Sequence, residues 1–169
     1  MKVIIIGGGQ VGGYIAKLLI DKGNSAVVIE NKENALQALE KNGIKKENIM
    51  VGDGTDALLL EKSGVRRCDA VVCVTGNDET NLAAAMMAKF EYDVPKVIGR
   101  VNNPKNAWLF NAGMGVDAKI NQADLIGHMI ADEMNYQSIM TLMRLSTGKY
   151  SIVPVGVDYH CPNANKPIA

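Results

Sequence analysis

The chain contains few of the features that would assign it at once to a class of protein. Its 18 basic and 18 acidic side chains cancel, and no long run of either sign occurs, so the sequence lacks the basic patch of a nucleic-acid-binding protein. Its longest uninterrupted apolar stretch is far shorter than the roughly 18 residues that favour a membrane span, so we expect no direct membrane insertion. The length of 169 residues allows one sizeable core but leaves little room for an additional catalytic domain.

Cysteine and histidine are also scarce. Cys68, Cys73 and Cys161 are odd in number and lack the spacing of metal ligands, so we expect reduced thiols, no disulfide and no metal site. Neither of the two histidines, His128 and His160, sits at a strand end where it would face a bound ligand, and no Ser-His-Asp or Cys-His arrangement is readable. The sequence therefore predicts no catalytic residue and favours binding without chemistry.

What the sequence does contain is a regular alternation of β-branched runs and stretches of helical periodicity. The runs predict six strands, at residues 3–6, 25–30, 48–52, 69–75, 96–101 and 117–121. The helical stretches lie near residues 12–22, 33–42, 55–63, 78–91, 104–112 and 123–136. Almost continuously apolar strands that alternate with helices predict an α/β fold of the Rossmann type: a doubly wound parallel six-stranded sheet with helices on both faces.

The pattern changes after residue 136. Residues 150–169 read as one strand followed by a loop rich in Pro and Asn, which is a helix and strand tail rather than a domain. We therefore predict one domain over residues 1–136 and a separate segment over residues 137–169.

The glycines of "KVIIIGGGQVGGYIAKLL", residues 2–19, carry the clearest functional signal. Gly7, Gly9 and Gly12 fall between a strand and a helix, where they allow a tight turn, the approach of a pyrophosphate, and close packing of helix on strand. Glu30 ends the second strand, where a carboxylate accepts hydrogen bonds from an adenosine ribose. Together they predict a nucleotide site. The structural alternatives are a glycine turn that only packs and a surface position for Glu30.

Polar residues also follow the later strands, at the edge of the sheet where open α/β domains bind ligands. They are Asp53 and Thr55 after the third strand, Thr75, Asn77, Asp78 and Asn81 after the fourth, and Arg100 at the end of the fifth. Three of them could instead have a purely structural role. Thr55 and Asp78 are also suited to cap the helices that follow, and Arg100 is also suited to a surface ion pair.

Several of these segments together resemble a known family. The segments "IIIGGGQVGGYIAKLL", "VVIENKENAL", "GDGTD", "VTGNDETNLAAAMMAK", "GRVNNP" and "GVDAKINQADLIGHMIA" occur in the order and spacing of the TrkA N-terminal domain, also called the KTN or RCK domain, of Trk-type potassium-uptake regulatory proteins. The resemblance covers residues 1 to about 136. The tail is similar to the start of the family's C-terminal ligand domain, with Cys161 where Ser is usual and Asn165 where Gly is usual. The resemblance implies that residues 137–169 are a linker and the beginning of a truncated C-terminal ligand domain.

The resemblance implies a cytoplasmic regulatory subunit, peripheral to the membrane through its partner, which is a membrane potassium transporter or channel subunit. It implies binding of NAD(H), or alternatively ATP/ADP, and control of potassium transport through a ligand-dependent conformational change. The implied cofactor-binding residues are Gly7, Gly8, Gly9, Gln10, Val11, Gly12, Glu30, Asn31, Asp53, Gly54, Thr55, Thr75, Gly76, Asn77, Asp78, Asn81 and Arg100. The alternative function is that of an NAD-dependent oxidoreductase fragment.

The family also assembles into homodimers and higher homo-oligomers, and one segment of this chain suits such an interface. Residues 123–143 place a series of apolar side chains on one surface: Leu125, Ile126, Met129, Ile130, Met134, Ile139, Leu142 and Met143. Methionine adapts readily to a partner surface. The alternative is that these methionines belong to the core.

Overall fold

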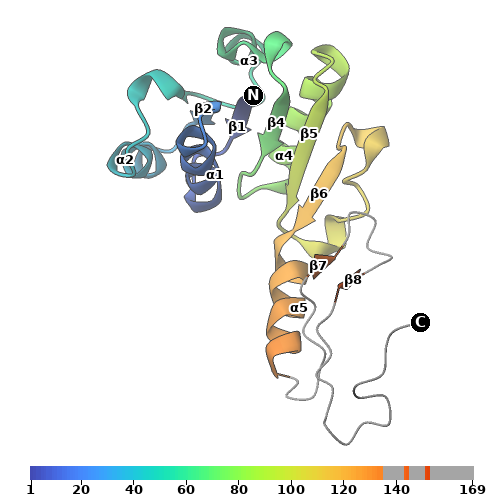
Figure 1. The fold of residues 1–169 in the computed structure, drawn as a ribbon. Helices are drawn as coiled ribbons and strands as arrows, with labels where there is room; N and C mark the ends of the chain where they lie inside the picture. The colour runs from blue at the N-terminus through green and yellow to red at the C-terminus, as the bar shows by residue number, and fades with distance from the viewer. Residues whose placement is uncertain (135–142, 145–150, 153–169) are drawn as a thin grey trace, which may run out of the picture. The chain divides into compact units, whose positions relative to one another are not determined.

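The β-branched runs form one parallel sheet in the computed structural model, which describes residues 1–134, 143–144 and 151–152 (Figure 1). The strands are β1 (Lys2–Ile6), β2 (Ser25–Glu30), β3 (Ile49–Val51), β4 (Ala70–Cys73), β5 (Lys96–Val101) and β6 (Ala118–Asn121). Their order is β3-β2-β1-β4-β5-β6, and every neighbouring pair is parallel. The predicted Rossmann-type fold is confirmed, and the strand order reverses between β1 and β4.

The two faces of this sheet carry separate apolar cores because successive residues of a strand point to opposite sides. Val3 and Ile5 of β1 are buried in one cluster with side chains from α1 (Gln10–Asp21) and α2 (Glu33–Lys41). Ile4 and Ile6 are buried in the other, with side chains from α3 (Ala57–Ser63) and α4 (Asp78–Met86). The helices therefore cover both faces, as a doubly wound sheet requires.

Most predicted helices form, within a few residues of their expected bounds. The helix predicted over 78–91 is α4 followed by a π-helical turn, η3 (Met87–Glu91), and the last is α5 (Gln122–Met134). Short 3₁₀ turns also occur at η1 (Lys46–Asn48) and η2 (Val65–Arg67).

The helix predicted over residues 104–112 is wrong. This stretch holds one 3₁₀ turn, η4 (Pro104–Asn106), and a second, η5 (Ala112–Met114), begins at its last residue. The side chain of Asn103 accepts a hydrogen bond from the amide of Lys105, and that of Asn111 accepts one from the amide of Gly113. Asparagine side chains that bond to nearby backbone in this way compete with helix formation.

The chain divides into two compact units, Met1–Asp124 and Leu125–Ala169, and α5 begins in the first. In the second unit, β7 (Met143–Arg144) pairs antiparallel with β8 (Ser151–Ile152). The strand β8 lies within the predicted tail strand, whereas the sequence did not indicate β7. The predicted division at residue 136 stays a prediction. Ile139, Leu142, His160, Cys161 and Asn165 lie outside the described residues.

Within the described part of the chain, no helix is both long and apolar enough to cross a membrane.

The two cysteines that the structure describes, Cys68 and Cys73, are free thiols, as expected. Both are buried in the core, and complete burial raises the pKa of Cys73 to about 12. Since the thiolate is the reactive form, Cys73 is an inert core residue at neutral pH.

Candidate functional site

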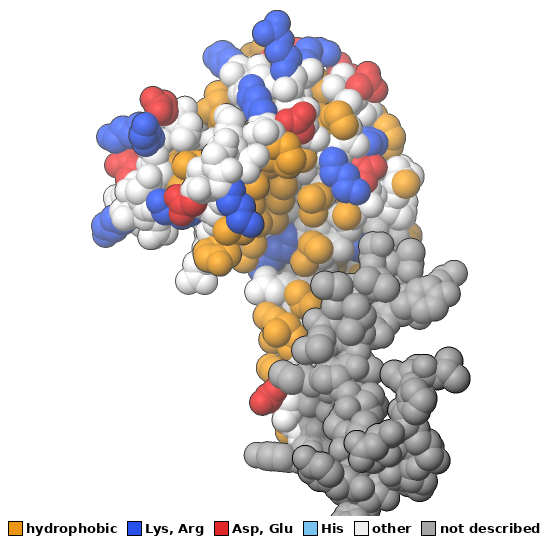
Figure 2. All heavy atoms as spheres, viewed as in Figure 1, with side chains coloured by type: hydrophobic (Ala, Val, Ile, Leu, Met, Phe, Trp, Pro, Cys, Tyr) orange, Lys and Arg blue, Asp and Glu red, His pale blue; other side chains and the backbone are white. Residues whose placement is uncertain are grey.

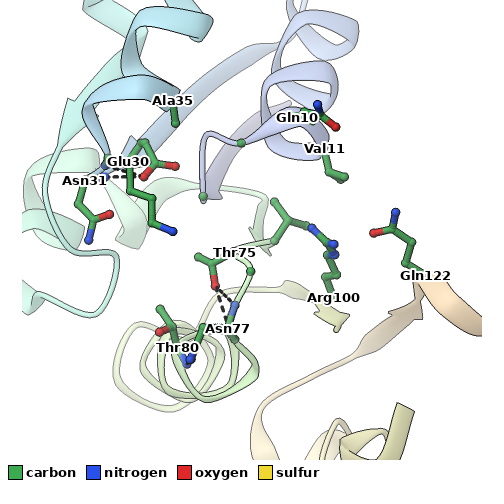
Figure 3. Close-up of a pocket in the computed structure, with 15 residues that line it drawn as sticks. Gln10, Val11, Glu30, Asn31, Ala35, Thr75, Asn77, Thr80, Arg100 and Gln122 are labelled. Atoms are coloured by element: carbon green, nitrogen blue, oxygen red, sulfur yellow. Dashed lines mark hydrogen bonds between the residues drawn. The ribbon is translucent and has the colours of Figure 1, made fainter. Parts of the chain in front are cut away.

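A cavity of about 500 Å³ opens at the carboxyl edge of the sheet, around the point where the strand order reverses (Figure 3). This main cavity lies where open α/β sheets bind ligands, and its volume is in the range of small-molecule sites. It is lined by Gly7, Gly9, Gln10, Val11, Glu30, Asn31, Lys32, Ala35, Val74, Thr75, Gly76, Asn77, Thr80, Arg100 and Gln122.

The three glycines of the first turn serve different purposes. Gly7 has a φ of 105°, and a Cβ there would lie 2.8 Å from the amide nitrogen of Thr75. A Cβ on Gly12 would run into the carbonyl oxygen of Gly7, so only glycine lets α1 pack this closely on the turn. A Cβ on Gly9 would meet nothing within 4 Å. Gly7 and Gly12 are thus required by the fold, whereas the absence of a side chain at Gly9 leaves space open beside the main cavity.

The first turn of α1 presents unbonded backbone N–H groups at this point. Gly9 precedes the helix and offers no side chain to cap it, and the first turn contains no acidic residue. The N–H groups at a helix start have no partners within the helix, and the helix dipole adds positive potential there. Because Gln10 and Val11 line the main cavity, an anion such as a phosphate fits this end of α1.

Glu30 is buried at the end of β2 rather than exposed, so its interpretation as a surface acid is wrong. Only 8% of the residue is accessible to solvent. Its carboxylate accepts a hydrogen bond of 2.6 Å from the amide of Gly8 and bonds of 2.8 Å from the amides of Asn31 and Lys32. The first bond fastens the glycine turn to the end of β2, and the other two fix the backbone that follows β2. A carboxylate offers about four acceptor positions, so room is left for one further donor.

Asn81 does not line the main cavity but fixes the turn that does. It is fully buried, and its side-chain oxygen accepts from the amide and hydroxyl of Thr75 at 2.9 and 2.7 Å. Its amide group donates to the carbonyl oxygens of Thr75 and Arg100. Asn81 therefore ties the end of β4 to the end of β5 and sets the position of Thr75.

Asp78 is likewise a structural residue, and its interpretation as a helix cap is wrong. Asn77 caps α4, accepting from the amide of Thr80 at 2.7 Å. The Asp78 carboxylate instead accepts from the backbone and side chain of Asn102, the backbone of Asn103 and the side chain of Asn106. Burial alone would raise the pKa of Asp78, but these hydrogen bonds outweigh it and lower the pKa.

The loop after β3 lies beside a smaller cavity. Asp53 and Gly54 line this minor cavity, which has a volume of about 40 Å³ and shares Gly7 and Glu30 with the main one. The backbone and hydroxyl of Thr55 donate to Asp53 and lower its pKa. Thr55 lines neither cavity and does not cap α3, because Asp56 does so by accepting from the amide of Leu58.

Two cationic residues line the main cavity without an ion pair to any described residue. They are Lys32, after β2, and Arg100, at the end of β5. The Nε atom of Arg100 is buried, and Arg100 forms no ion pair with the described residues, so the surface ion pair considered for it is not found among them. Among the described residues of the lining Glu30 is the one acid, and its carboxylate is already engaged by backbone amides. The main cavity therefore suits an anionic ligand.

The predicted and the observed lining of the main cavity agree in part. Ten predicted residues line the main cavity: Gly7, Gly9, Gln10, Val11, Glu30, Asn31, Thr75, Gly76, Asn77 and Arg100. Seven do not, namely Gly8, Gly12, Asp53, Gly54, Thr55, Asp78 and Asn81, although Asp53 and Gly54 line the minor cavity. Five residues of the lining were not predicted: Lys32, Ala35, Val74, Thr80 and Gln122. Gln122 follows the sixth strand, so the strand-end criterion applied to the other strands would have found it.

The sequence of this chain is similar to a family of known proteins. The model of the TrkA-N domain family matches residues 3–122. The Trk system potassium uptake protein TrkA of Mycobacterium tuberculosis is 32% identical over 99% of the chain and 75% of its own length. A TrkA homolog of Methanothermobacter thermautotrophicus is 39% identical over 72% of the chain and 54% of its own length.

The fold is also similar to solved structures of the GsuK channel. One, of the channel bound to NAD, has a TM-score of 0.63 and 20% identity, and covers 79% of this chain and 24% of the channel chain. Another, of GsuK bound to ADP, has a TM-score of 0.68 and 19% identity, and covers 81% of this chain and 34% of the other. At this identity the likeness shows that the fold is shared.

Proposed function

The chain belongs to the TrkA-N domain family, and from this premise we propose that it is a regulatory subunit of a potassium transport system that binds NAD(H) in the main cavity. ATP and ADP are the alternative ligands. One observation carries the proposal: an uncapped helix start and two cations that form no ion pair with the described residues surround a space opposite a carboxylate that ends β2. Phosphate suits the first two features and a ribose hydroxyl suits the third.

The ligand would enter with its adenosine toward Glu30 and its phosphates toward α1. A ribose hydroxyl would take the remaining acceptor position of the Glu30 carboxylate. The phosphates would bind the N–H groups near Gln10 and Val11 and pair with Arg100. The adenine would lie on the side of Asp53, where the minor cavity adjoins the main one through shared residues.

The partner in this proposal is a membrane potassium transporter or channel subunit, with this chain at its cytoplasmic side. Support comes from the relatives named as Trk potassium uptake proteins and from the shared fold with the GsuK channel. Ligand would act by a conformational change, which requires different affinities for two arrangements of the protein.

A homodimer or larger homo-oligomer is the proposed assembly, because apolar surface is exposed on two elements. Along α5, Leu125, Ile126, Met129, Ile130 and Met134 are between 44% and 74% exposed. On the sheet, Figure 2 shows apolar side chains gathered between α1 and β6, and Ile120 of β6 is 49% exposed. Exposed apolar patches of several hundred Å² mark interaction sites.

Light scattering tests the assembly. Wild-type protein should be at least a dimer, and Ile130→Asp, which puts two charges into one two-fold contact, should shift it toward monomer. Glu133→Gln, at an exposed position of the same helix, is the matched control and should leave the mass unchanged. A monomeric wild type would contradict the assembly proposal.

Ligand identification tests the central proposal. Calorimetric titration with NADH, NAD, ADP and ATP should give saturable binding of at least one of them. Rubidium uptake can be measured in cells that carry Arg100→Ala in place of the wild-type gene. Its rate should differ from that of wild-type cells, because the variant no longer binds the nucleotide that regulates transport. Oxidation of NADH in the presence of carbonyl compounds would instead favour the oxidoreductase alternative. Absence of binding by all four nucleotides would refute the proposed function.

A further inference from the structure

The Asp78 carboxylate joins the wall of the main cavity to the loop 102–111 that follows β5. Asp78 is the first residue of α4 and comes directly after Asn77, which lines the main cavity (Figure 3). Its carboxylate accepts four hydrogen bonds of 2.7–3.0 Å, from the backbone and side chain of Asn102, the backbone of Asn103 and the side chain of Asn106. The start of the loop 102–111 is therefore held by one side chain of α4.

Two residues that line the main cavity lie next to this network. The carbonyl oxygen of Thr75 accepts a hydrogen bond of 3.0 Å from the side chain of Asn102. Arg100 precedes Asn102 by two residues, and the buried side chain of Asn81 bonds to the carbonyl oxygens of both Thr75 and Arg100. A ligand that contacts Thr75 and pairs with Arg100 therefore restrains the two chain segments between which the start of the loop is fastened.

The loop 102–111 itself does not contact the ligand space. Its residues are all described, and none of them lines the main or the minor cavity. Its middle is weakly anchored: Trp108 is 72% exposed, while Lys119 donates a hydrogen bond of 2.6 Å to the carbonyl oxygen of Ala107. Phe110 is buried at the far end of the loop. Because exposed segments open locally at low cost, the order of this loop depends on its few attachments.

Resting on the proposed function, in which a nucleotide occupies the main cavity, we infer that the Asp78 network couples nucleotide binding to the order of the loop 102–111. The bound nucleotide holds Thr75 and Arg100, and Asp78 and Asn102 pass this restraint to the loop. Coupling of this kind is reciprocal, so a loop that is detached from Asp78 lowers the affinity for the nucleotide. The loaded protein then presents Trp108 on a more ordered loop, which is a difference at the surface that a partner protein can recognise.

Hydrogen exchange measured by mass spectrometry tests the coupling, with the tightest-binding of NAD, NADH, ADP and ATP at saturation. In wild-type protein the nucleotide should slow exchange of the backbone amides of residues 102–109 at least about fivefold, the lower end of typical couplings between sites. The amides of η1, which precedes the edge strand β3, are the reference and should exchange at an unchanged rate.

Asp78→Ala removes the acceptor of all four bonds, so the slowing by nucleotide should be lost, and calorimetry should show about fivefold weaker binding. A purely structural role of Asp78 would change exchange with and without nucleotide alike. Lys105→Ala, at an exposed position of the same loop, is the matched control and should retain the slowing.

The outcomes separate this inference from the proposed function. If wild-type protein binds none of the four nucleotides, the proposed function fails and the coupling fails with it. If it binds one of them but the loop exchanges at an unchanged rate, or the slowing is as large in Asp78→Ala as in the wild type, the inference is overturned and the proposed function stands. If thermal unfolding shows that Asp78→Ala does not fold, Asn106→Leu, which removes one of the bonds to Asp78, takes its place. It should reduce the slowing, and undiminished slowing in this variant would overturn the inference.

Discussion

At the β2 end of the main cavity the Glu30 carboxylate is engaged by the chain itself, whereas at the β5–β6 end Arg100 and Gln122 hold buried polar atoms without partners among the described residues. The first end is preorganised by three hydrogen bonds to backbone amides. The second has polar atoms that no described residue pairs. The difference separates two kinds of binding residue: removal of the first kind should lower stability, and removal of the second kind should lower affinity alone.

The largest effect is expected for Glu30→Ala. The change leaves the amides of Gly8, Asn31 and Lys32 without their acceptor, so the free energy of unfolding should fall by about 3 kcal/mol. Binding of NADH should also weaken, because the ribose loses its proposed acceptor and the Gly8 amide loses a bond that helps to hold the glycine turn against β2. Urea denaturation measures the first effect and calorimetry the second.

The matched control is Glu33→Ala, an exposed acid three residues further along, which should change stability by less than about 0.5 kcal/mol. Equal stability of the Glu30 and Glu33 variants would mean that the buried carboxylate does not hold the turn, and the contrast between the two ends would disappear.

For Arg100→Ala we expect a loss of ligand affinity with almost no loss of stability. Its guanidinium forms no ion pair with the described residues, so unfolding by urea should be almost unchanged. Affinity for ADP should fall about ten- to a hundredfold, since a charge-assisted hydrogen bond contributes about 1.5–3 kcal/mol. Adenosine, which lacks phosphate, should bind the variant and the wild type alike.

Arg67→Ala, which removes an exposed arginine from η2, serves as the control for net charge. A loss of adenosine affinity as large as the loss of ADP affinity would assign Arg100 a structural role instead.

Asp78 holds the loop that follows β5, the strand that ends with Arg100 and Val101. Removal of its carboxylate should lower the free energy of unfolding by an amount that depends on pH. Asp78→Asn places an amide against donors from Asn102, Asn103 and Asn106, so at pH 7 unfolding should be easier by about 2 kcal/mol. Because hydrogen bonds lower the pKa of Asp78 in the folded protein, the wild type has this stabilisation above the unfolded pKa, about 3.9, and loses it as pH falls below that value.

Urea denaturation of the Asp78 variant and the wild type at several pH values should therefore show a stability difference that shrinks below about pH 4. Glu79→Gln, the next residue in the first turn of α4 and exposed, should show a much smaller difference at every pH. A difference that grows on acidification would contradict the assigned role of Asp78.

The fold could be predicted because its strands are almost continuously apolar and β-branched, a pattern that leaves few alternatives to a buried parallel sheet. The segment 104–112 could not, because its structure depends on contacts from elsewhere. Phe110 is buried against Gly99 of β5, and Lys119 of β6 donates to the carbonyl oxygen of Ala107. Such tertiary contacts override a local helical pattern.

The candidate site was predictable where backbone geometry dictates the residue, and less so where a side chain has two possible roles. Gly7 and Gly12 are recognisable because no other residue fits the turn. Asp78 and Asn81 follow the correct strand, yet their polar groups turn away from the main cavity to tie β4 to β5 and its loop. Lys32 carries no signal of its own, because an exposed lysine after a strand is common.

The smallest effect concerns selectivity at the Glu30 end. NADPH carries a phosphate on the ribose hydroxyl that Glu30 is expected to bind, and this phosphate would place negative charge beside a buried carboxylate. We expect NADPH to bind about tenfold more weakly than NADH, a difference of about 1.4 kcal/mol.

Lys32, the cation nearest in sequence to Glu30, lines the same end and offsets part of the repulsion. Lys32→Ala should therefore widen the ratio of the two dissociation constants, whereas Lys22→Ala, outside the main cavity, should leave it unchanged. Calorimetric titration of each protein with both cofactors gives these ratios. Equal affinities of the wild type for NADH and NADPH would show that the ribose does not lie against Glu30, and the adenosine would have to be placed elsewhere in the main cavity.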